Sequence, residues 1–193
     1  MQQICVFCGT STGANHAYVK HAQHLGQVLV EKNITLIYGA SSDGVMAAIA
    51  NAMLAAGGKV IGVIPHALCE REDVHTGLTE LHLVDTMHQR KALMNELADG
   101  FITLPGGIGT MEEFFEMWTW AQLGVHQKPC GLLNIASYYD PLLAFLEHMV
   151  AQRFLRPEHR ELVYVETNPE RLIAHLSAYS PAKRGQNLDI TKT

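Results

Sequence analysis

The sequence predicts an α/β fold: one doubly wound sheet of mainly parallel strands, with helices on both of its faces. Short apolar runs rich in β-branched residues alternate with segments whose apolar residues recur at helical spacing, and this is the pattern of repeated strand–helix–strand units. The strand runs are almost continuously apolar, so both faces of the sheet are expected to be covered. The chain has 193 residues, of which 48% are hydrophobic, and this length corresponds to about one domain.

The first half of the chain alternates between the two kinds of element. The opening strand stops where Gly9 interrupts its apolar run, Gly57 ends the second helix, and Pro65 ends a β-branched strand. The third helix begins at a capping box, in which Thr86 and Gln89 each accept a hydrogen bond from the other's backbone amide. In order, the expected elements are strand 3–8, helix 17–32, strand 35–38, helix 44–56, strand 59–64, strand 80–84 and helix 87–98.

The second half continues the alternation. Pro105 closes a strand, and Gly124 is the expected C-terminal residue of the helix that follows. The expected elements are strand 101–104, helix 111–123, strand 130–135, helix 140–152, strand 162–165 and helix 169–179. Residues 1–179 are therefore predicted to form a single Rossmann-like domain, and the polar residues 180–193 a mobile tail.

Composition and charge exclude several classes of protein. With 14 basic and 19 acidic residues the net charge is −5, and no basic run is long enough to hold a nucleic-acid backbone. Asn51, Asn134 and Asp140 interrupt the apolar stretches before they reach the roughly 20 residues that a membrane span needs. The first residues carry no basic, leader-like segment. We therefore expect a cytoplasmic protein with no nucleic-acid or membrane partner, whose four cysteines stay reduced.

Cysteines and histidines offer a metal or redox alternative that the sequence does not favour. Cys5 and Cys8 lie three positions apart in a strand, so their side chains should point to opposite faces and cannot easily share a metal or a disulfide. The histidine pairs at positions 21 and 24 and at positions 75 and 82 lack the carboxylate or cysteine spacing that completes a metal site. Buried thiols and surface histidines are the favoured interpretation, and no metal site is predicted.

Three glycine-containing segments follow expected strands, at residues 9–13, 39–44 and 105–110. In doubly wound sheets, ligands bind outside the carboxyl ends of the strands. In the third segment Thr110 is the expected N-cap, and the amides of Met111 and its neighbours would point at an anion. The loop lacks the lysine of a Walker A motif, and Glu112 stands where a dinucleotide fingerprint has its third glycine. We interpret it as a site for a single phosphate; the alternative is an ordinary strand-to-helix turn.

Helical spacing places two charged residues on apolar faces. Glu113 shares a face with Met117, where a carboxylate costs free energy unless it has a partner or a task. Arg90 aligns with Met94 on the inward face of its helix. Its guanidinium can reach a phosphate or a carboxylate there, and the alternative is a side chain that extends to the surface. For the neighbouring Glu112, compensation of the helix dipole is a sufficient explanation.

Two motifs occur together in the chain. They are Met87-His88-Gln89-Arg90-Lys91 and Pro105-Gly106-Gly107-Ile108-Gly109-Thr110-Met111-Glu112-Glu113. As a pair they resemble the signature of the LOG (Lonely Guy) family of cytokinin riboside 5′-monophosphate phosphoribohydrolases, which are often labelled lysine decarboxylases. The similarity runs from about residue 4 to residue 179 and includes the segments at 6–9, 119–124 and 131–134.

The resemblance implies hydrolysis of the N-glycosidic bond in an adenine-type nucleoside 5′-monophosphate, either a cytokinin riboside monophosphate or AMP. The products are the free base and ribose 5-phosphate. Arg90 and Glu113 match the catalytic pair of the family, which works without a metal or an organic cofactor and forms homodimers or larger assemblies with the site near the subunit contact. The substrate-binding positions that it implies are Glu72, Lys91, Gly106, Gly107, Ile108, Gly109, Thr110, Met111, Glu112 and Thr119.

The chain departs from the family in one segment. Where the family has Gly-Gly-Gly-x-x-Gly after the second strand, this chain has Gly39-Ala40-Ser41-Ser42-Asp43-Gly44. Asp43 either caps the next helix or alters the nucleotide pocket. Two other functions stay open: a non-catalytic nucleotide- or pterin-cofactor-binding protein on the same fold, and a lysine decarboxylase. The latter needs pyridoxal phosphate and a Schiff-base lysine, for which only Lys91 adjoins the predicted site.

Overall fold

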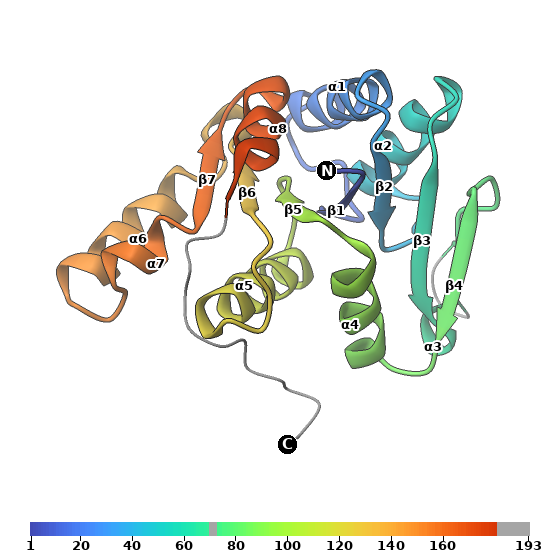
Figure 1. Cartoon of the computed structure of the whole chain (residues 1–193). Helices are drawn as coiled ribbons and strands as arrows, with labels where there is room; N and C mark the ends of the chain where they lie inside the picture. The colour runs from blue at the N-terminus through green and yellow to red at the C-terminus, as the bar shows by residue number, and fades with distance from the viewer. Residues whose placement is uncertain (70–72, 181–193) are drawn as a thin grey trace.

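A computed structural model describes residues 1–69 and 73–180. The predicted tail beyond residue 180 and the predicted substrate-binding residue Glu72 lie outside these ranges. Within them, the strands form one parallel sheet with the order β4-β3-β2-β1-β5-β6-β7 (Figure 1). The strands are β1 Gln3–Phe7, β2 Thr35–Tyr38, β3 Val60–Pro65, β4 Glu80–Val84, β5 Gly100–Thr103, β6 Cys130–Leu133 and β7 Val163–Glu166.

The direction in which the chain builds the sheet reverses between β1 and β5. From β1 the chain adds β2, β3 and β4 outward on one side, and it then returns to place β5, β6 and β7 on the other. Ile4 of β1 is in register with Leu36 of β2 on one side and with Gly100 of β5 on the other. Such a reversal leaves a crevice at the carboxyl ends of the two central strands, so the fold predicts where a ligand binds.

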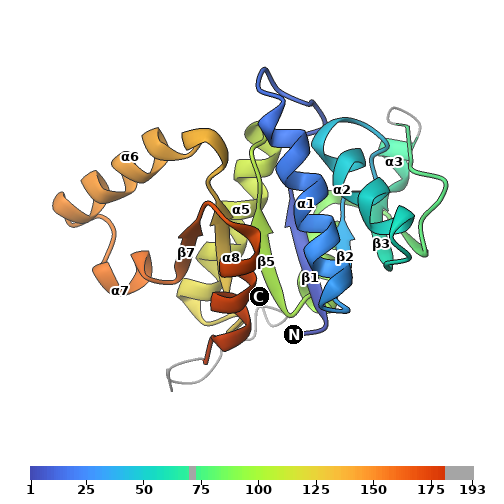
Figure 2. The same ribbon diagram turned by 90° about the horizontal axis from the view of Figure 1, so that it is seen from above.

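Helices cover both faces of the sheet, as predicted (Figures 1 and 2). One face carries α1 Ala17–Glu31, α2 Gly44–Ala55 and α8 Pro169–Ala178, and the other carries α4 Met87–Leu97 and α5 Ile108–Leu123. Beside β7, α6 Asp140–Ala151 and α7 Pro157–Arg160 project away from the rest of the molecule in both views. The shorter elements are α3 His66–Cys69 and the 3₁₀ turn Ile135–Ser137.

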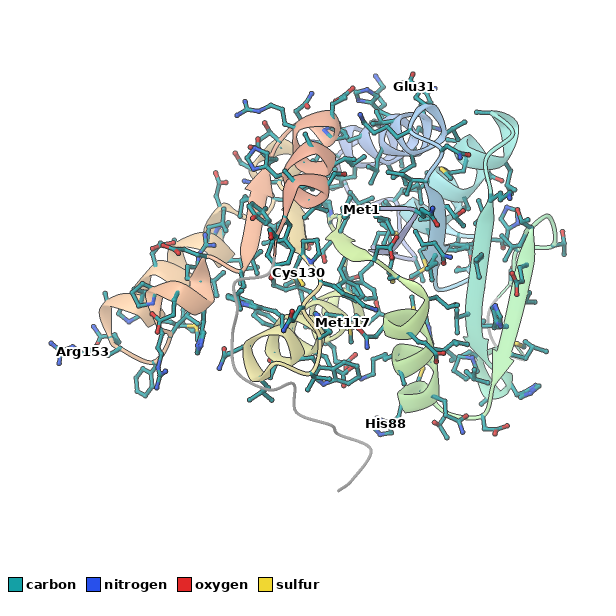
Figure 3. All side chains as sticks on the ribbon, in the orientation of Figure 1. Met1, Glu31, His88, Met117, Cys130 and Arg153 are labelled. Atoms are coloured by element: carbon teal, nitrogen blue, oxygen red, sulfur yellow. The ribbon has the colours of Figure 1, made fainter. Side chains whose placement is uncertain are left out.

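The hydrophobic core is divided into two layers by the sheet. Cys8 of the segment after β1 belongs to the layer under α1 and α2, whereas Cys5 belongs to the layer under α4 and α5. The two thiols therefore face opposite sides of the sheet, as strand geometry predicted. Met117 and Cys130 lie inside the second layer, whereas Arg153 lies at the tip of the α6–α7 projection (Figure 3).

The predicted elements match the observed ones to within a few residues, with two kinds of difference. The helix expected from residue 111 begins at Ile108, and the strand expected to reach residue 135 ends at Leu133. The short helices α3 and α7 and the 3₁₀ turn were not predicted, because four residues or fewer are too short to show a helical period. In the described residues no helix is long and apolar enough to cross a membrane.

Candidate active site

A cavity of about 400 Å³ opens at the carboxyl ends of β1 and β5. Its lining comes from the residues after β1, the start of α2, α3, α4 and the first turns of α5. Two of the three glycine-containing segments line it directly, through Gly9 and Gly107, and the segment at 39–44 lies behind it, where Gly39 contacts Arg90. The cavity thus stands at the reversal point of the sheet, where the strand order predicted a ligand.

The start of α5 presents unpaired amides to the cavity. Gly107 is the N-cap, and the first intrahelical bond runs from Met111 N to Gly107 O at 3.1 Å. The amides of Ile108, Gly109 and Thr110 therefore precede the hydrogen-bonded part of the helix, and they donate to no described residue. All three residues line the cavity. Free amides at a helix N-terminus suit a phosphate, both as donors and through the helix dipole.

The prediction that Thr110 caps this helix is wrong. Thr110 is buried in the first turn, and its hydroxyl packs against Gly106. A Cβ atom on Gly106 would lie 2.1 Å from Thr110 Oγ1, so only glycine fits at that position. The anion-facing amides consequently begin three residues earlier than the sequence suggested, and the amide of Met111 is not among them.

Arg90 reaches the cavity from α4. The predicted capping box is present, with Gln89 N donating to Thr86 Oγ1 at 3.1 Å, and it fixes the first turn of the helix. The Arg90 side chain points inward and is only 6% exposed, which excludes the surface alternative. Its Nη2 occupies the place where a Cβ atom of Gly39 would be, at 2.0 Å. Its Nε is buried with no hydrogen-bond partner among the described residues. The Arg90 side chain also lines the cavity, so the guanidinium can meet a ligand through the part that lies at the cavity surface.

Glu113 lies beside Arg90 in the lining of the cavity. It is 5% exposed, and its Oε1 lies 3.7 Å from Arg90 Nη2. Burial raises the pKa of Glu113 to about 7; the positive charge of Arg90 opposes this effect, and the nearby Glu112 adds to it. A carboxyl group that titrates near neutral pH in a cavity is suited to general acid–base or electrostatic catalysis. The inward position of both charges was predicted from helical spacing alone.

Comparison with known proteins supplies the family. A family model described as possible lysine decarboxylase matches residues 46–176. A cytokinin riboside 5′-monophosphate phosphoribohydrolase of Rhodococcoides fascians is 48% identical over 174 residues, which cover 90% of this chain and 88% of that protein. A protein of the same name from Arabidopsis thaliana is 45% identical over 180 residues, which cover 93% of this chain and 83% of that protein. The chain belongs to the LOG family.

Solved structures with a similar backbone show the fold alone. The molybdenum cofactor binding protein of Rippkaea orientalis superposes with a TM-score of 0.68 at 20% identity, over 92% of this chain and 97% of that one. The molybdenum cofactor carrier protein of Chlamydomonas reinhardtii gives 0.67 at 19% identity, over 91% and 96%. At this identity the LOG-family chain and the two proteins share an architecture, and the predicted enzyme class rests on the phosphoribohydrolase relatives.

The second basic residue of the LOG motif points away from the cavity. Lys91 is buried, and its Nζ contacts Glu112 Oε1 and lies 3.0 Å from Glu116 Oε2. Burial acts to lower the pKa of Lys91, but hydrogen bonds and attraction from the two carboxylates outweigh burial and raise it. Lys91 therefore fixes α4 against α5 as a protonated ammonium. It is not among the described residues that line the cavity.

The other LOG-family positions fall into two groups. Gly107, Ile108, Gly109, Thr110 and Glu112 line the cavity. Thr119 lies on the exposed face of α5, away from the lining, and Met111 is half-buried against the core. Gly106 lies behind the loop, where its carbonyl accepts a hydrogen bond from Tyr138.

The segment after β2, where this chain departs from the LOG family, adds no charged residue to the described lining of the cavity. Asp43 is exposed, occupies the N-cap position of α2 without a side-chain cap bond, and does not line the cavity. Ala40 adopts a left-handed conformation with φ +65°, which glycine would adopt without strain. The amides of Val45 and Met46 both donate to Gly9 O, so they bind the loop after β1. These two amides of α2 are consequently paired within the protein, unlike the first amides of α5.

The apolar part of the cavity lining was not predicted from the sequence. Met46, Leu68 and Met87 line the cavity, and so do Cys8 and Thr10. Thr10 follows the first glycine of its loop, which is a signal that was available. The apolar residues carry no such signal, because a methionine or leucine in a helix predicts a position in the hydrophobic core.

The histidines proposed as alternative metal ligands have separate neighbours. His24 pairs with Glu170 of α8 at 2.8 Å, and His82 with Glu80 of its own strand at 2.9 Å. His75 Nε2 lies 2.9 Å from Asn51 Oδ1. Among the described residues no group of three or more potential ligands gathers at one point.

Proposed function

We propose that this LOG-family chain hydrolyses the N-glycosidic bond of cytokinin riboside 5′-monophosphates and of AMP. The observation that carries the proposal is the buried Arg90–Glu113 pair, 3.7 Å apart, beside the unpaired amides of α5 in one cavity. The names of the R. fascians and A. thaliana relatives support the reaction. The cavity volume of about 400 Å³ is within the ordinary range for small-ligand sites.

The phosphate is bound at the start of α5. The amides of Ile108, Gly109 and Thr110 supply donors with no competing partner among the described residues, and the helix dipole adds a favourable field. The guanidinium of Arg90, which lines the same cavity, binds the phosphate or the departing base. A substrate held in this way presents its ribose toward Glu113, which lines the same cavity.

Glu113 acts on the anomeric carbon. As the bond between that carbon and the base nitrogen breaks, its electron pair leaves with the base and the sugar gains oxocarbenium character. The Glu113 carboxylate stabilises this positive charge and accepts a proton from the water that adds to the carbon, by the logic of glycoside hydrolysis. The base takes up a proton from solvent as it leaves, and Glu113 returns the proton it accepted to solvent, so that one water molecule is consumed per bond. Positioning and fixed charges lower the barrier without a cofactor.

The geometry of Lys91 disfavours lysine decarboxylation. A Schiff-base lysine must present a neutral amine to the aldehyde of pyridoxal phosphate. Lys91 is instead held as an ammonium by Glu112 and Glu116, which raise its pKa. A non-catalytic nucleotide-binding protein would bind monophosphates without releasing base, so the assay below also decides that alternative.

The experiment is an assay for free base and ribose 5-phosphate from AMP and from isopentenyladenosine 5′-monophosphate. Glu113→Gln keeps the shape of the side chain and removes its charge, so kcat is expected to fall by about 100-fold or more. Glu31→Gln is the matched control, because Glu31 is exposed at the end of α1, on the other side of the sheet (Figure 3). Near-normal turnover by Glu113→Gln would contradict the assignment.

We also propose that a second copy of the chain covers the exposed face of α5. Ile108, Phe115 and Leu123 are exposed on this face although they are apolar, and Ile108 is 87% exposed. Glu112 and Thr119 lie on the same stripe, because positions 108, 112, 115, 119 and 123 are three or four apart. A second copy on this stripe would bring its own Thr119 near the cavity mouth, which accounts for a substrate-binding position outside the lining.

The oligomeric state tests this arrangement. Phe115→Glu is expected to convert a dimer into a monomer in sedimentation analysis and to reduce activity. Phe154→Glu places the same charge at an equally apolar and more exposed residue, beyond the tip of α6, and should leave the dimer intact. A monomeric wild-type chain, or a Phe115→Glu dimer, would contradict the proposal.

A further inference from the structure

Two consecutive tyrosines hold the phosphate loop from behind. Tyr138 donates its hydroxyl proton to Gly106 O at 2.6 Å, and Tyr139 donates to Leu104 O at the same distance of 2.6 Å. The two acceptors stand on either side of Pro105, so the two hydrogen bonds fix the backbone just before and just after this proline. Burial raises the pKa of Tyr139, which keeps its hydroxyl protonated as a donor.

The bond from Tyr138 reaches the peptide group at the N-cap of α5. The carbonyl of Gly106 and the amide of Gly107 belong to one peptide unit, so fixing the carbonyl also fixes the direction of the amide. Gly107 lines the cavity. A hydrogen bond to a carbonyl polarises the amide at the other end of the same unit. The effect is a fixed and stronger donor at Gly107, directly before the amides of Ile108, Gly109 and Thr110.

Tyr138 is not among the described residues that line the candidate active site. It lines a second cavity of about 210 Å³ together with Tyr18, whose ring meets the Tyr138 ring edge-on at 5.6 Å. Tyr138 is 39% exposed. A hydroxyl that can reach water instead adds little net stability by bonding to protein, so the bond to Gly106 O does more for loop orientation than for folding.

The turn that carries the tyrosines is strained and firmly held. Ala136 and Ser137 both have left-handed backbones, with φ of 50° and 60°, a conformation that non-glycine residues adopt at a cost. Asn134 holds the turn closed: its Oδ1 accepts from Tyr139 N at 2.8 Å, and its Nδ2 donates to Asp140 Oδ1 at 2.7 Å. Strain that neighbours maintain in this way is typical of segments with a positioning task.

We infer that Tyr138 is a positioning residue for recognition of the substrate's 5′-phosphate: it orients and polarises the Gly106–Gly107 peptide, with Tyr139 fixing the other end of the loop. The inference rests on the proposed function, because it takes the start of α5 as the phosphate site. It predicts that Tyr138 affects ligands with a phosphate group and leaves ligands without one unaffected.

The test is Tyr138→Phe, which keeps the ring and removes only the hydroxyl. KM for a nucleoside 5′-monophosphate and Kd for ribose 5-phosphate, measured by calorimetry, should both rise by about fivefold, the value of one net hydrogen bond. The kcat value and the KM for the unphosphorylated nucleoside should stay within twofold. Tyr164→Phe is the matched control, because Tyr164 lies on β7 against His175 and Tyr179, away from both cavities.

Each outcome distinguishes a positioning role of Tyr138 from a purely structural contact. An unchanged Kd for ribose 5-phosphate, or a loss of thermal stability without a change in Kd, would overturn the positioning role and leave a structural contact. Tyr139→Phe is the second variant, and it should raise Kd and also lower stability, because Tyr139 is buried. If the wild-type chain binds ribose 5-phosphate but releases no base, the proposed function fails. The Kd comparison then still tests the positioning role of Tyr138. A wild-type chain that binds no ribose 5-phosphate overturns both.

Discussion

Arg90 Nη2 and Glu113 Oε1 lie 3.7 Å apart, with both side chains buried at the wall of one cavity. The separation leaves the two groups attracted to each other without a close hydrogen bond, so each keeps capacity for a ligand. The Arg90 guanidinium lies against Gly39, in space that a Cβ atom at that position would fill. Two oppositely charged residues thus lie in the same cavity as the unpaired amides at the start of α5.

Arg90→Lys is expected to lower kcat/KM by about 100-fold or more, because an ammonium lacks the planar fork of donors. A lysine keeps the positive charge, so an effect of charge alone predicts a much smaller loss. Steady-state kinetics with AMP or isopentenyladenosine monophosphate makes the comparison. A variant with more than half of the wild-type activity would show that geometry at Arg90 is unimportant.

The pH dependence of activity should follow Glu113. Its pKa is raised to about 7, mainly by burial, and the proposed mechanism needs the carboxylate. The value of kcat/KM should therefore rise with pH up to about 7 and level off above it, and it should fall tenfold per pH unit on the acidic side. The second ionisation of a substrate phosphate has a pKa of about 6. A kcat/KM profile with its midpoint at that pH would show that the phosphate, and not Glu113, controls the pH dependence.

Stability should depend on pH in the opposite sense. The folded pKa of Glu113 lies above its unfolded value, with about 7 against 4.5, so the native chain binds the extra proton between these two values. This contribution is fully present below pH 4.5 and is lost as the pH rises through about 7. Relative to wild type, Glu113→Gln should gain up to about 3 kcal/mol between mildly acid and alkaline pH. Urea unfolding at both pH values measures it, and equal pH trends in the two proteins would contradict it.

Gly39→Ala should displace the Arg90 side chain. The new Cβ atom would stand 2.0 Å from Arg90 Nη2, so the guanidinium must move and activity should fall to the level of Arg90→Ala. In the Arg90→Ala background the space is open, and adding Gly39→Ala should change neither activity nor stability by more than about 0.5 kcal/mol. Additive losses in this double-mutant cycle would place the effect of Gly39 elsewhere.

Lys91→Gln should destabilise the contact between α4 and α5. It removes the cation that pairs with Glu112 and Glu116, and a cost of about 1–3 kcal/mol is expected for leaving these groups without their partner. Lys59→Gln is the control, because Lys59 is exposed just before β3. Thermal unfolding compares the two. A Lys91→Gln chain that unfolds at the wild-type temperature would show that the buried ammonium has no structural role.

Much of the fold followed from the sequence, because strand and helix periods differ and alternate along the chain. The inward positions of Arg90 and Glu113 followed from helical spacing, since each lies in a long helix with an evident apolar face. The start of α5 was misplaced because glycine and threonine are about equally favoured as N-caps, so residue type does not decide between Gly107 and Thr110.

Other parts of the site depend on contacts between distant segments. Lys91 meets Glu112 and Glu116 only because α4 and α5 pack side by side. The bonds from Tyr138 and Tyr139 end on backbone carbonyls, and every residue has a carbonyl, so no residue type marks the acceptor. Such partners become visible only when the chain is folded.

The central claim is phosphate-anchored cleavage of an N-glycosidic bond at Arg90 and Glu113. The most direct measurement is the rate of base release by the wild-type chain from a nucleoside 5′-monophosphate and from the same nucleoside without its phosphate. The free amides of α5 and the Arg90 guanidinium in the same cavity predict that kcat/KM is at least about 100-fold higher for the monophosphate. Equal rates on the two compounds, or no base released from either, would contradict the account.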